Sequence, residues 1–288
     1  MSNHSEVPLG SISHDNKFDL STTELKEMAK KLRRHVITMI ATAGSGHPGG
    51  SLSAADIITA LYFKVLRHSP QNPQWPDRDR FILSKGHAAP ILYAALAETG
   101  YFPVAELATL RKLNSHLQGH ADRKFTLGVE MSSGSLGMGL SFAIGVALAA
   151  RLDSKAYQTC VLLSDGECEE GQTWEAAISA AHFKLDNLTA IVDYNGIQLS
   201  GWIRDIMNLE PFTQKWQAFG WHTIDIDGHD FDQILSAYQE AEKIKGKPIV
   251  IVAHTIKGKG VSFMENNAAF HGKSPTREEA ERALKELE

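Results

Sequence analysis

The middle of the chain alternates short, continuously apolar segments with segments of helical character. Four apolar segments have the length of β-strands, and they are Thr159–Leu163, Leu188–Val192, Trp221–Ile226 and Pro248–Ala253. Helices are predicted between them over Thr173–Phe183 and Phe231–Ile244. Strands buried on both faces have unbroken apolar sequences, and parallel neighbours need a crossover that is usually helical. The alternation therefore predicts an α/β fold with a mostly parallel central sheet and helices on both faces.

The region before these strands is predicted to be largely helical. Ser21-Thr22-Thr23-Glu24 has the pattern of a capping box, and apolar residues recur at helical spacing from Leu25 to Ile40. Further helices are predicted from Ser53, as the N-cap, to about Leu66, over Ala88–Thr99 and over Gly137–Leu152. No linker or internal repeat interrupts the pattern. We expect a polar N-terminal extension over residues 1–20, one domain over 21–275 and a helical tail over 276–288.

Composition narrows the class of protein. The net charge of −5 and the scattered basic residues do not favour a nucleic-acid partner. No apolar run reaches the ~18 residues that span a bilayer, and the first 20 residues have no secretory pattern. The two cysteines, Cys160 and Cys168, have no ligand-like neighbours and fit a reducing cytoplasm. We therefore expect a cytoplasmic protein without a membrane segment.

Two polar turns follow neighbouring predicted strands. Ser164-Asp165-Gly166 closes the first strand, and Asn195-Gly196 closes the second. In an open parallel sheet, ligands bind outside the carboxyl ends of the strands. A carboxylate and an amide oxygen there are ligands that Mg²⁺ or Ca²⁺ takes, and Mg²⁺ leaves room for phosphate oxygens. Taken alone, the pair is better explained by two ordinary Asp-Gly and Asn-Gly turns.

The wider pattern resembles a known family. Asp165-Gly166, followed after 28 residues by Asn195, resembles the thiamine diphosphate signature, in which a glycine usually stands where this chain has Ser164. The order of the other motifs is similar to that of the N-terminal domain of transketolases over residues 22–275. These motifs are Gly46-His47-Pro48-Gly49-Gly50, Ser84-Lys85-Gly86-His87, Gln118-Gly119-His120, Gly134-Ser135-Leu136-Gly137-Met138-Gly139, Lys257-Gly258-Lys259-Gly260 and Phe270-His271-Gly272.

The resemblance implies a cofactor site with defined roles. Asp165, Asn195 and the backbone carbonyl of Ile197 would hold Mg²⁺, for which Ca²⁺ or Mn²⁺ would substitute. The residues expected to bind thiamine diphosphate are His87, Gly134, Leu136, Gly137, Asp165, Gly166, Glu170, Asn195 and His271. His47, His120 and His271 are expected to be catalytic. His47 and His120 resemble histidines that face the substrate channel and hydrogen-bond the oxygens of the sugar, whereas His87 and His271 resemble histidines that contact the diphosphate. Glu175 resembles an acidic residue near the subunit interface.

The resemblance also implies a partner. In transketolases, the glutamate that activates the cofactor belongs to a second, pyrimidine-binding domain, and this chain ends soon after Phe270-His271-Gly272. We expect a C-terminal transketolase subunit to supply that domain in an α₂β₂ heterotetramer. The expected reaction moves a two-carbon ketol unit from a ketose, commonly a phosphate, to an aldose. The alternatives are a 1-deoxyxylulose-phosphate-synthase-like enzyme, a 2-oxo acid dehydrogenase alpha-type subunit or a non-catalytic structural subunit.

Other conspicuous residues are expected to be structural. Trp174 and Trp221 are interpreted as core or interface anchors. The histidines outside the matched motifs are expected to pack or to lie on the surface, and they are His35, His68, His116, His182, His222, His229 and His254. One further segment is interpreted differently. Lys257–Gly260 follows a predicted strand and is expected to be a functional loop.

Overall fold

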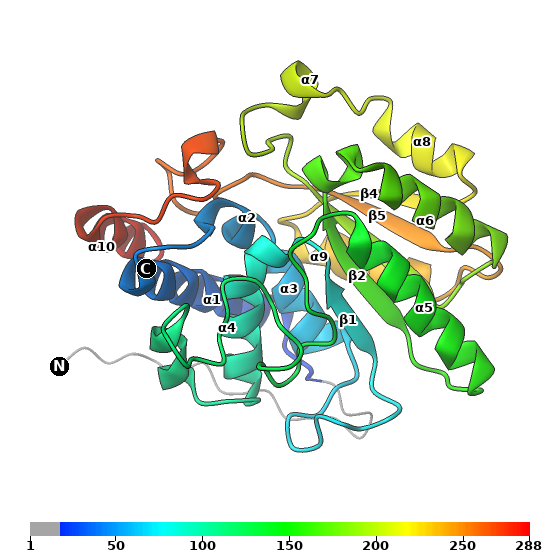
Figure 1. Ribbon diagram of the computed structural model, residues 1–288, viewed down its shortest axis with the longest axis horizontal. Helices are drawn as coiled ribbons and strands as arrows, with labels where there is room; N and C mark the ends of the chain where they lie inside the picture. The colour runs from blue at the N-terminus through cyan, green and yellow to red at the C-terminus, as the bar shows by residue number, and fades with distance from the viewer. Residues whose placement is uncertain (1–17) are drawn as a thin grey trace.

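A five-stranded, fully parallel sheet forms the centre of the computed structural model, which describes residues 18–288 (Figure 1). Its strands are β1 (Arg80–Leu83), β2 (Thr159–Ser164), β3 (Leu188–Tyr194), β4 (His222–Asp227) and β5 (Ile249–His254), arranged in the order β1-β2-β3-β5-β4. The predicted fold class is confirmed. Residues 1–17, most of the expected N-terminal extension, lie outside the described residues.

Ten α-helices surround the sheet in this part of the chain. They are α1 (Thr22–Ala43), α2 (Pro48–Ser53), α3 (Ala55–Ala60), α4 (Ala89–Thr99), α5 (Met138–Leu152), α6 (Gly171–His182), α7 (Ile203–Ile206), α8 (Phe212–Ala218), α9 (Phe231–Ala241) and α10 (Arg277–Glu286). Within residues 18–288, none of them combines the length and apolar character that a bilayer crossing requires.

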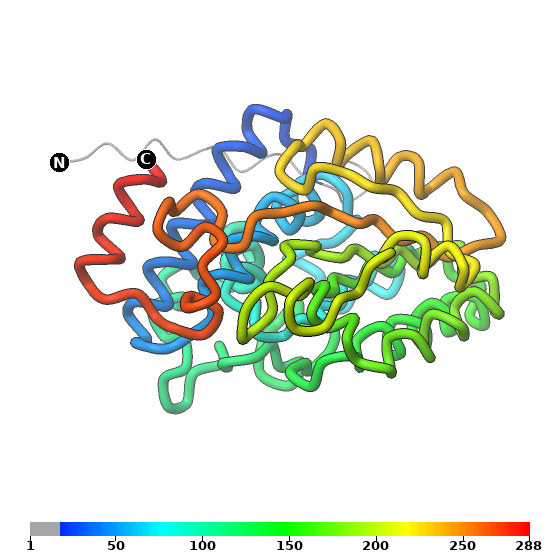
Figure 2. Tube along the Cα trace, turned by 90° about the horizontal axis from the view of Figure 1, so that it is seen from above, coloured from blue at the N-terminus to red at the C-terminus, as the bar shows by residue number. Residues whose placement is uncertain are grey.

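The helices cover both faces of the sheet, as the unbroken apolar strands predict. Figure 2 shows α9 above the sheet and α5 and α6 below it. Alternate strand residues point to opposite faces, so that Leu162 and Ile191 join the core beneath α1, α3, α4 and α9. Val161 and Val192 join a second core with α5, α6 and α8. The sheet is therefore the rigid middle layer from which the loops of the site project.

The first helix begins and ends where its local sequence indicates. Ser21 is the N-cap of α1, and the Ser21–Glu24 capping box is present. Gly44 ends the helix in the left-handed conformation, with φ of 63°. Helix α10 lies beside α1 (Figure 1), where the Arg34 guanidinium donates to the carbonyl of Leu284 at 3.2 Å. The expected tail is thus packed against the N-terminal helix.

The prediction for the second helix is wrong in its start and in the role of Ser53. Helix α2 begins five residues earlier, with Pro48 at its first position, where the fixed φ of proline suits a helix. The helical region is broken at Ala54 and ends in a π-helical turn over Leu61–Val65. The Ser53 hydroxyl does not cap a helix: it donates to the carboxylate of Asp193 at 2.6 Å.

Candidate active site

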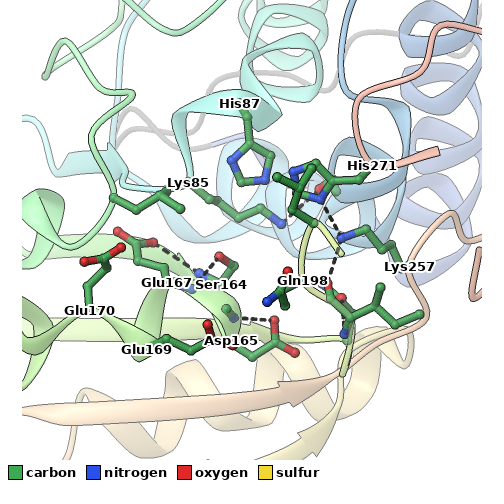
Figure 3. Close-up of a pocket in the computed structure, with 16 residues that line it drawn as sticks. Lys85, His87, Ser164, Asp165, Glu167, Glu169, Glu170, Gln198, Lys257 and His271 are labelled. Carbon is green, nitrogen blue, oxygen red and sulfur yellow. Dashed lines mark hydrogen bonds between the residues drawn. The ribbon is translucent and has the colours of Figure 1, made fainter. Parts of the chain in front are cut away.

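A cavity of about 250 Å³ lies at the carboxyl ends of the strands. Loops that follow β1, β2, β3 and β5 line it, as expected for an open parallel sheet. Figure 3 shows Lys85, His87, His271 and Lys257 along one side and Asp165, Glu167, Glu169 and Glu170 along the other. The lining is therefore divided into a side rich in nitrogen donors and a side rich in carboxylates.

Asp165 lies at the end of β2, and its side chain spans to the neighbouring strand end. One carboxylate oxygen accepts from the Gly166 N–H at 2.8 Å, and the other accepts from the Gly196 N–H. Burial and the nearby charge of Asp193 raise the pKa of Asp165 to about 7. The adjacency of the two polar turns, predicted from one helical crossover, is confirmed by the parallel pairing of β2 with β3.

Asn195 and Ile197 lie in the turn after β3. The Asn195 amide nitrogen donates to the Asp193 carboxylate at 3.4 Å, while its amide oxygen accepts from the Ile197 N–H at 3.2 Å. The Ile197 carbonyl accepts from the Lys257 ammonium at 2.8 Å. An oxygen of this kind has two lone pairs, so each of these acceptors keeps one for a further partner.

Lys257 connects the turn after β3 to the loop that carries His271. Its ammonium also lies 3.0 Å from Nδ1 of His271, and only 2% of the lysine is exposed. Burial, followed by the charge of Lys85, lowers the pKa of Lys257 to about 8. Burial and the Lys257 charge lower the pKa of His271 to about 3. Lys257, the first residue of the loop Lys257–Gly260 that was interpreted from sequence as functional, thus lines the cavity.

Four predicted histidines gather beside the cavity, from four segments of the chain. The ring centre of His47 lies 5.4 Å from that of His87, 5.8 Å from that of His120 and 5.6 Å from that of His271. Burial, and then the charge of Arg111, lower the pKa of His47 to about 4. Burial also holds the pKa of His87 well below its usual value. Neutral imidazoles therefore face this side of the site near pH 7.

The structure also places the remaining predicted residues. Leu136, Gly166 and Glu170 line the cavity, and a β-carbon on Gly166 would meet the Gln198 side chain at 3.0 Å. A β-carbon on Gly134 would lie 3.5 Å from the His120 ring, outside the cavity lining. Glu175 lies on the exposed face of α6 and does not line the cavity.

Sequence reasoning missed the role of Glu167. This fully buried carboxylate accepts from the Ser84 hydroxyl after β1 and from the Gly137 N–H at 2.9 Å. It also pairs reciprocally with Ser164: each backbone N–H donates to the other side chain at 3.3 Å. The Ser164-x-x-Glu167 spacing is itself a capping-box signal that could have found this contact.

Asp193 was also missed, although its sequence setting is conspicuous. It is a fully buried carboxylate within the apolar strand β3, where a charge must be paired. Its partners are the Lys85 ammonium and the hydroxyls of Ser53 and Thr255. These contacts tie the segments after β1 and β5 and the C-terminal end of α2 to the middle strand of the sheet.

The donor set fits a divalent cation with a diphosphate. Asp165, Asn195 and the Ile197 carbonyl offer oxygens of the type that Mg²⁺ binds. No group of three or more His, Cys, Asp and Glu side chains between residues 18 and 288 is arranged to hold a metal alone. A cation at the three oxygens would need further donors, which phosphate oxygens supply. The nitrogen-rich side of the cavity in Figure 3 suits their negative charge.

Comparisons with known proteins agree with this site. The model of the family "Transketolase, thiamine diphosphate binding domain" matches residues 24–287. The chain is 46% identical over 265 residues to the 6-deoxy-6-sulfo-D-fructose transketolase subunit SqwG of Clostridium sp. (strain MSTE9), covering 92% of this chain and 96% of that protein. It is 42% identical over 273 residues to an apulose-4-phosphate transketolase subunit from Actinobacillus succinogenes, covering 94% and 99% respectively.

Longer transketolases match over part of their length. Human transketolase is 41% identical over 264 residues, which are 91% of this chain and 42% of the human protein. The structure of transketolase from Leishmania mexicana superposes with a TM-score of 0.88 and 32% identity, covering 91% of this chain and 41% of that one. The chain therefore belongs to the transketolase family and contains its thiamine diphosphate-binding domain.

Proposed function

We propose that this chain is the diphosphate-binding subunit of a two-subunit transketolase that moves a two-carbon ketol unit from a ketose to an aldose. The observation that carries the proposal is a single cavity lined by Asp165, Asn195 and Ile197, in which the buried Lys257 donates to the Ile197 carbonyl. We prefer ketol transfer to the alternatives because the relatives described above are named transketolases.

The metal end of the site would be held by this chain alone. Asp165, Asn195 and the Ile197 carbonyl would bind Mg²⁺, or Ca²⁺ or Mn²⁺ in its place. Lys257 and His87 would neutralise or donate to the diphosphate, and Gly166 would let it approach the backbone. Bound thiamine diphosphate supplies the carbon nucleophile and the electron sink for breaking and making the carbon–carbon bond.

The neutral histidines would act on the sugar. His47, His120 and His271 lie beside the cavity with lowered pKa values, so each ring can donate one hydrogen bond without carrying a charge. Donors fixed where a carbonyl oxygen gains negative charge stabilise the transition state. A ring within reach of the same oxygen can also give or accept its proton.

A partner chain would complete the site. The match covers almost the whole length of two relatives, and each of these is named a transketolase subunit. By contrast, the match covers only 42% of human transketolase. The segment after β3 presents exposed apolar side chains near the cavity, and they are Leu199, Trp202, Ile206 and Met207. We propose that a pyrimidine-binding chain with the activating glutamate covers them in a cytoplasmic α₂β₂ assembly.

The donor is proposed to be a ketose with a terminal anionic group. The names of the two subunit relatives specify a sulfo sugar and a sugar phosphate.

The test uses the complex purified from native cells, with 6-deoxy-6-sulfofructose, apulose 4-phosphate and fructose 6-phosphate as donors and an aldose phosphate as acceptor. Ketol transfer from at least one donor is expected, together with no carbon dioxide from pyruvate. Decarboxylation of pyruvate without ketol transfer would overturn the proposal.

A substitution separates catalysis from assembly. Asp165→Ala in the same complex should abolish transfer while the subunits remain associated, because Asp165 is internal to the cavity. Asp153→Asn, on the exposed end of α5, is the matched control and should leave the rate unchanged. Full activity of the Asp165→Ala complex would show that this chain is a structural subunit.

A further inference from the structure

Arg111 joins the two loops that carry His47 and His120. One guanidinium nitrogen donates to the Ser45 hydroxyl at 2.9 Å, two residues before His47. The other donates to the Gly119 carbonyl at 3.2 Å, directly before His120, and lies 3.5 Å from Nδ1 of His47. A single planar group therefore sets the separation of the two loops.

The backbone around Arg111 is built for this placement. Arg111 has φ of 59°, a left-handed conformation that is unfavourable for a residue with a side chain. Its N–H donates to the Leu117 carbonyl at 2.9 Å, which closes the loop between them. A β-carbon on Gly119 would lie 2.9 Å from Cζ of Arg111, so glycine is needed for the guanidinium to lie against the backbone.

The contact with His47 has a chemical consequence. A guanidinium only donates hydrogen bonds, so Nδ1 of His47 must be the acceptor and the ring proton must lie on Nε2. We propose that Arg111 is a positioning residue, which fixes the separation of the His47 and His120 loops and leaves Nε2–H of His47 as the donor of that ring. The catalytic consequence rests on the function proposed above, whereas the state of the ring is a property of this chain.

The charges around His47 act in the same direction. After burial, the groups that lower the pKa of His47 are Arg111, His120 and Lys257. The other rings packed against it are those of His87 and His271. Burial and then Arg111 also lower the pKa of His120. Loss of the guanidinium should therefore raise the pKa of both histidines toward 6.5.

Nuclear magnetic resonance of the ring nitrogens in the full chain tests the ring state without any activity assay. Arg111→Gln should raise the pKa of His47. Gly119→Ala keeps every charge but forces the guanidinium away, so it should shift the same resonance in the same direction. Lys112→Gln removes an exposed positive charge one residue away and should change nothing. A proton on Nδ1 of His47 in the unsubstituted chain, or an unchanged pKa in both variants, would overturn the proposal.

Kinetics of the reconstituted complex provide the second measurement. Arg111→Gln should lower kcat about 10- to 100-fold, because small displacements of catalytic groups cost this much. Its cofactor affinity should stay within about twofold, since Arg111 is outside the cavity lining. Arg111→Lys keeps the positive charge but cannot bond to the same acceptors. Its His47 pKa should therefore stay close to that of the unsubstituted chain, while its kcat should remain lowered. Equal losses of cofactor affinity and kcat would indicate general damage to the fold and overturn a positioning role. If the complex is inactive even with Arg111, the proposed function fails while the resonance result stands.

Discussion

Lys85, which lines the candidate cofactor cavity, forms a buried ion pair with Asp193. The side chains are 1% and 0% exposed, and Lys85 also donates to the Gly50 carbonyl at 3.0 Å. The pair links the segment after β1 to helix α2 and to the carboxyl-terminal part of β3. Because its members are removed from solvent, each depends on the other for stabilisation.

Breaking this pair should be costly. Asp193→Asn leaves the Lys85 ammonium buried without a counter-charge, and we expect a loss of about 3–5 kcal/mol in the free energy of unfolding. Denaturation by urea measures it. The control is Arg277→Ala, which removes a surface pair with Glu281 and should change stability by less than about 0.5 kcal/mol. Similar midpoints for both variants would contradict the account of the pair.

Removing the carboxylate charge at residue 165 should weaken the dependence of cofactor affinity on Mg²⁺. Asp165→Asn keeps the shape of the side chain but loses its charge, so Mg²⁺-dependent affinity for thiamine diphosphate should fall about 100-fold, equivalent to about 3 kcal/mol. Calorimetric titration with and without Mg²⁺ measures this. An affinity that still responds to Mg²⁺ as in the unsubstituted chain would exclude Asp165 as a ligand.

Ser164 is expected to stabilise the turn after β2 through Glu167. Ser164→Ala removes the hydroxyl that accepts from the Glu167 N–H and should cost about 1 kcal/mol. Ser164→Gly restores the usual signature residue but adds backbone freedom, so it should cost up to about 1 kcal/mol more. Thermal unfolding of the two variants measures the difference. A more stable glycine variant would mean that the serine strains the turn.

Two partly buried histidines should make the stability of the chain sensitive to acid. The folded chain holds the pKa of His47 at about 4 and that of His271 at about 3, below the usual 6.5. At these two rings the unfolded chain therefore binds more protons between pH 6.5 and pH 4, so the histidine contribution to stability falls as the pH decreases, whereas Asp165, with its raised pKa, contributes in the opposite direction. Urea midpoints of the full chain at pH 7 and pH 5 measure the slope. His271→Gln should reduce it, whereas exposed His182→Gln should not; equal slopes for all three proteins would contradict the prediction.

The sequence was most informative where local patterns decide structure. The capping box at Ser21 and the apolar strands fix α1 and the sheet, because capping and burial on both faces leave direct signals. Helices α7 and α8 were not predicted; they are only 4 and 7 residues long. Ser53 was misread because its hydroxyl serves a residue 140 positions away. Such long-range polar contacts have no local pattern.

The candidate site divides in the same way. The histidines and strand-end ligands belong to recognisable motifs, and the structure brings His47, His87, His120 and His271 together. The supporting residues Arg111, Glu167 and Asp193 act through tertiary contacts, which require the fold to be known. Their burial or backbone geometry identifies them once the chain is folded.

The central claim is that this chain works as one half of a transketolase. The most direct measurement is the rate of two-carbon transfer by the complex captured through this chain from its native cells, compared with the rate of the chain alone. We predict transfer only by the complex, with a second thiamine-family chain of about 300 residues, an ordinary size for one or two domains, present in equal amount. Transfer by the isolated chain, or a captured complex that lacks such a partner and is inactive, would contradict the account.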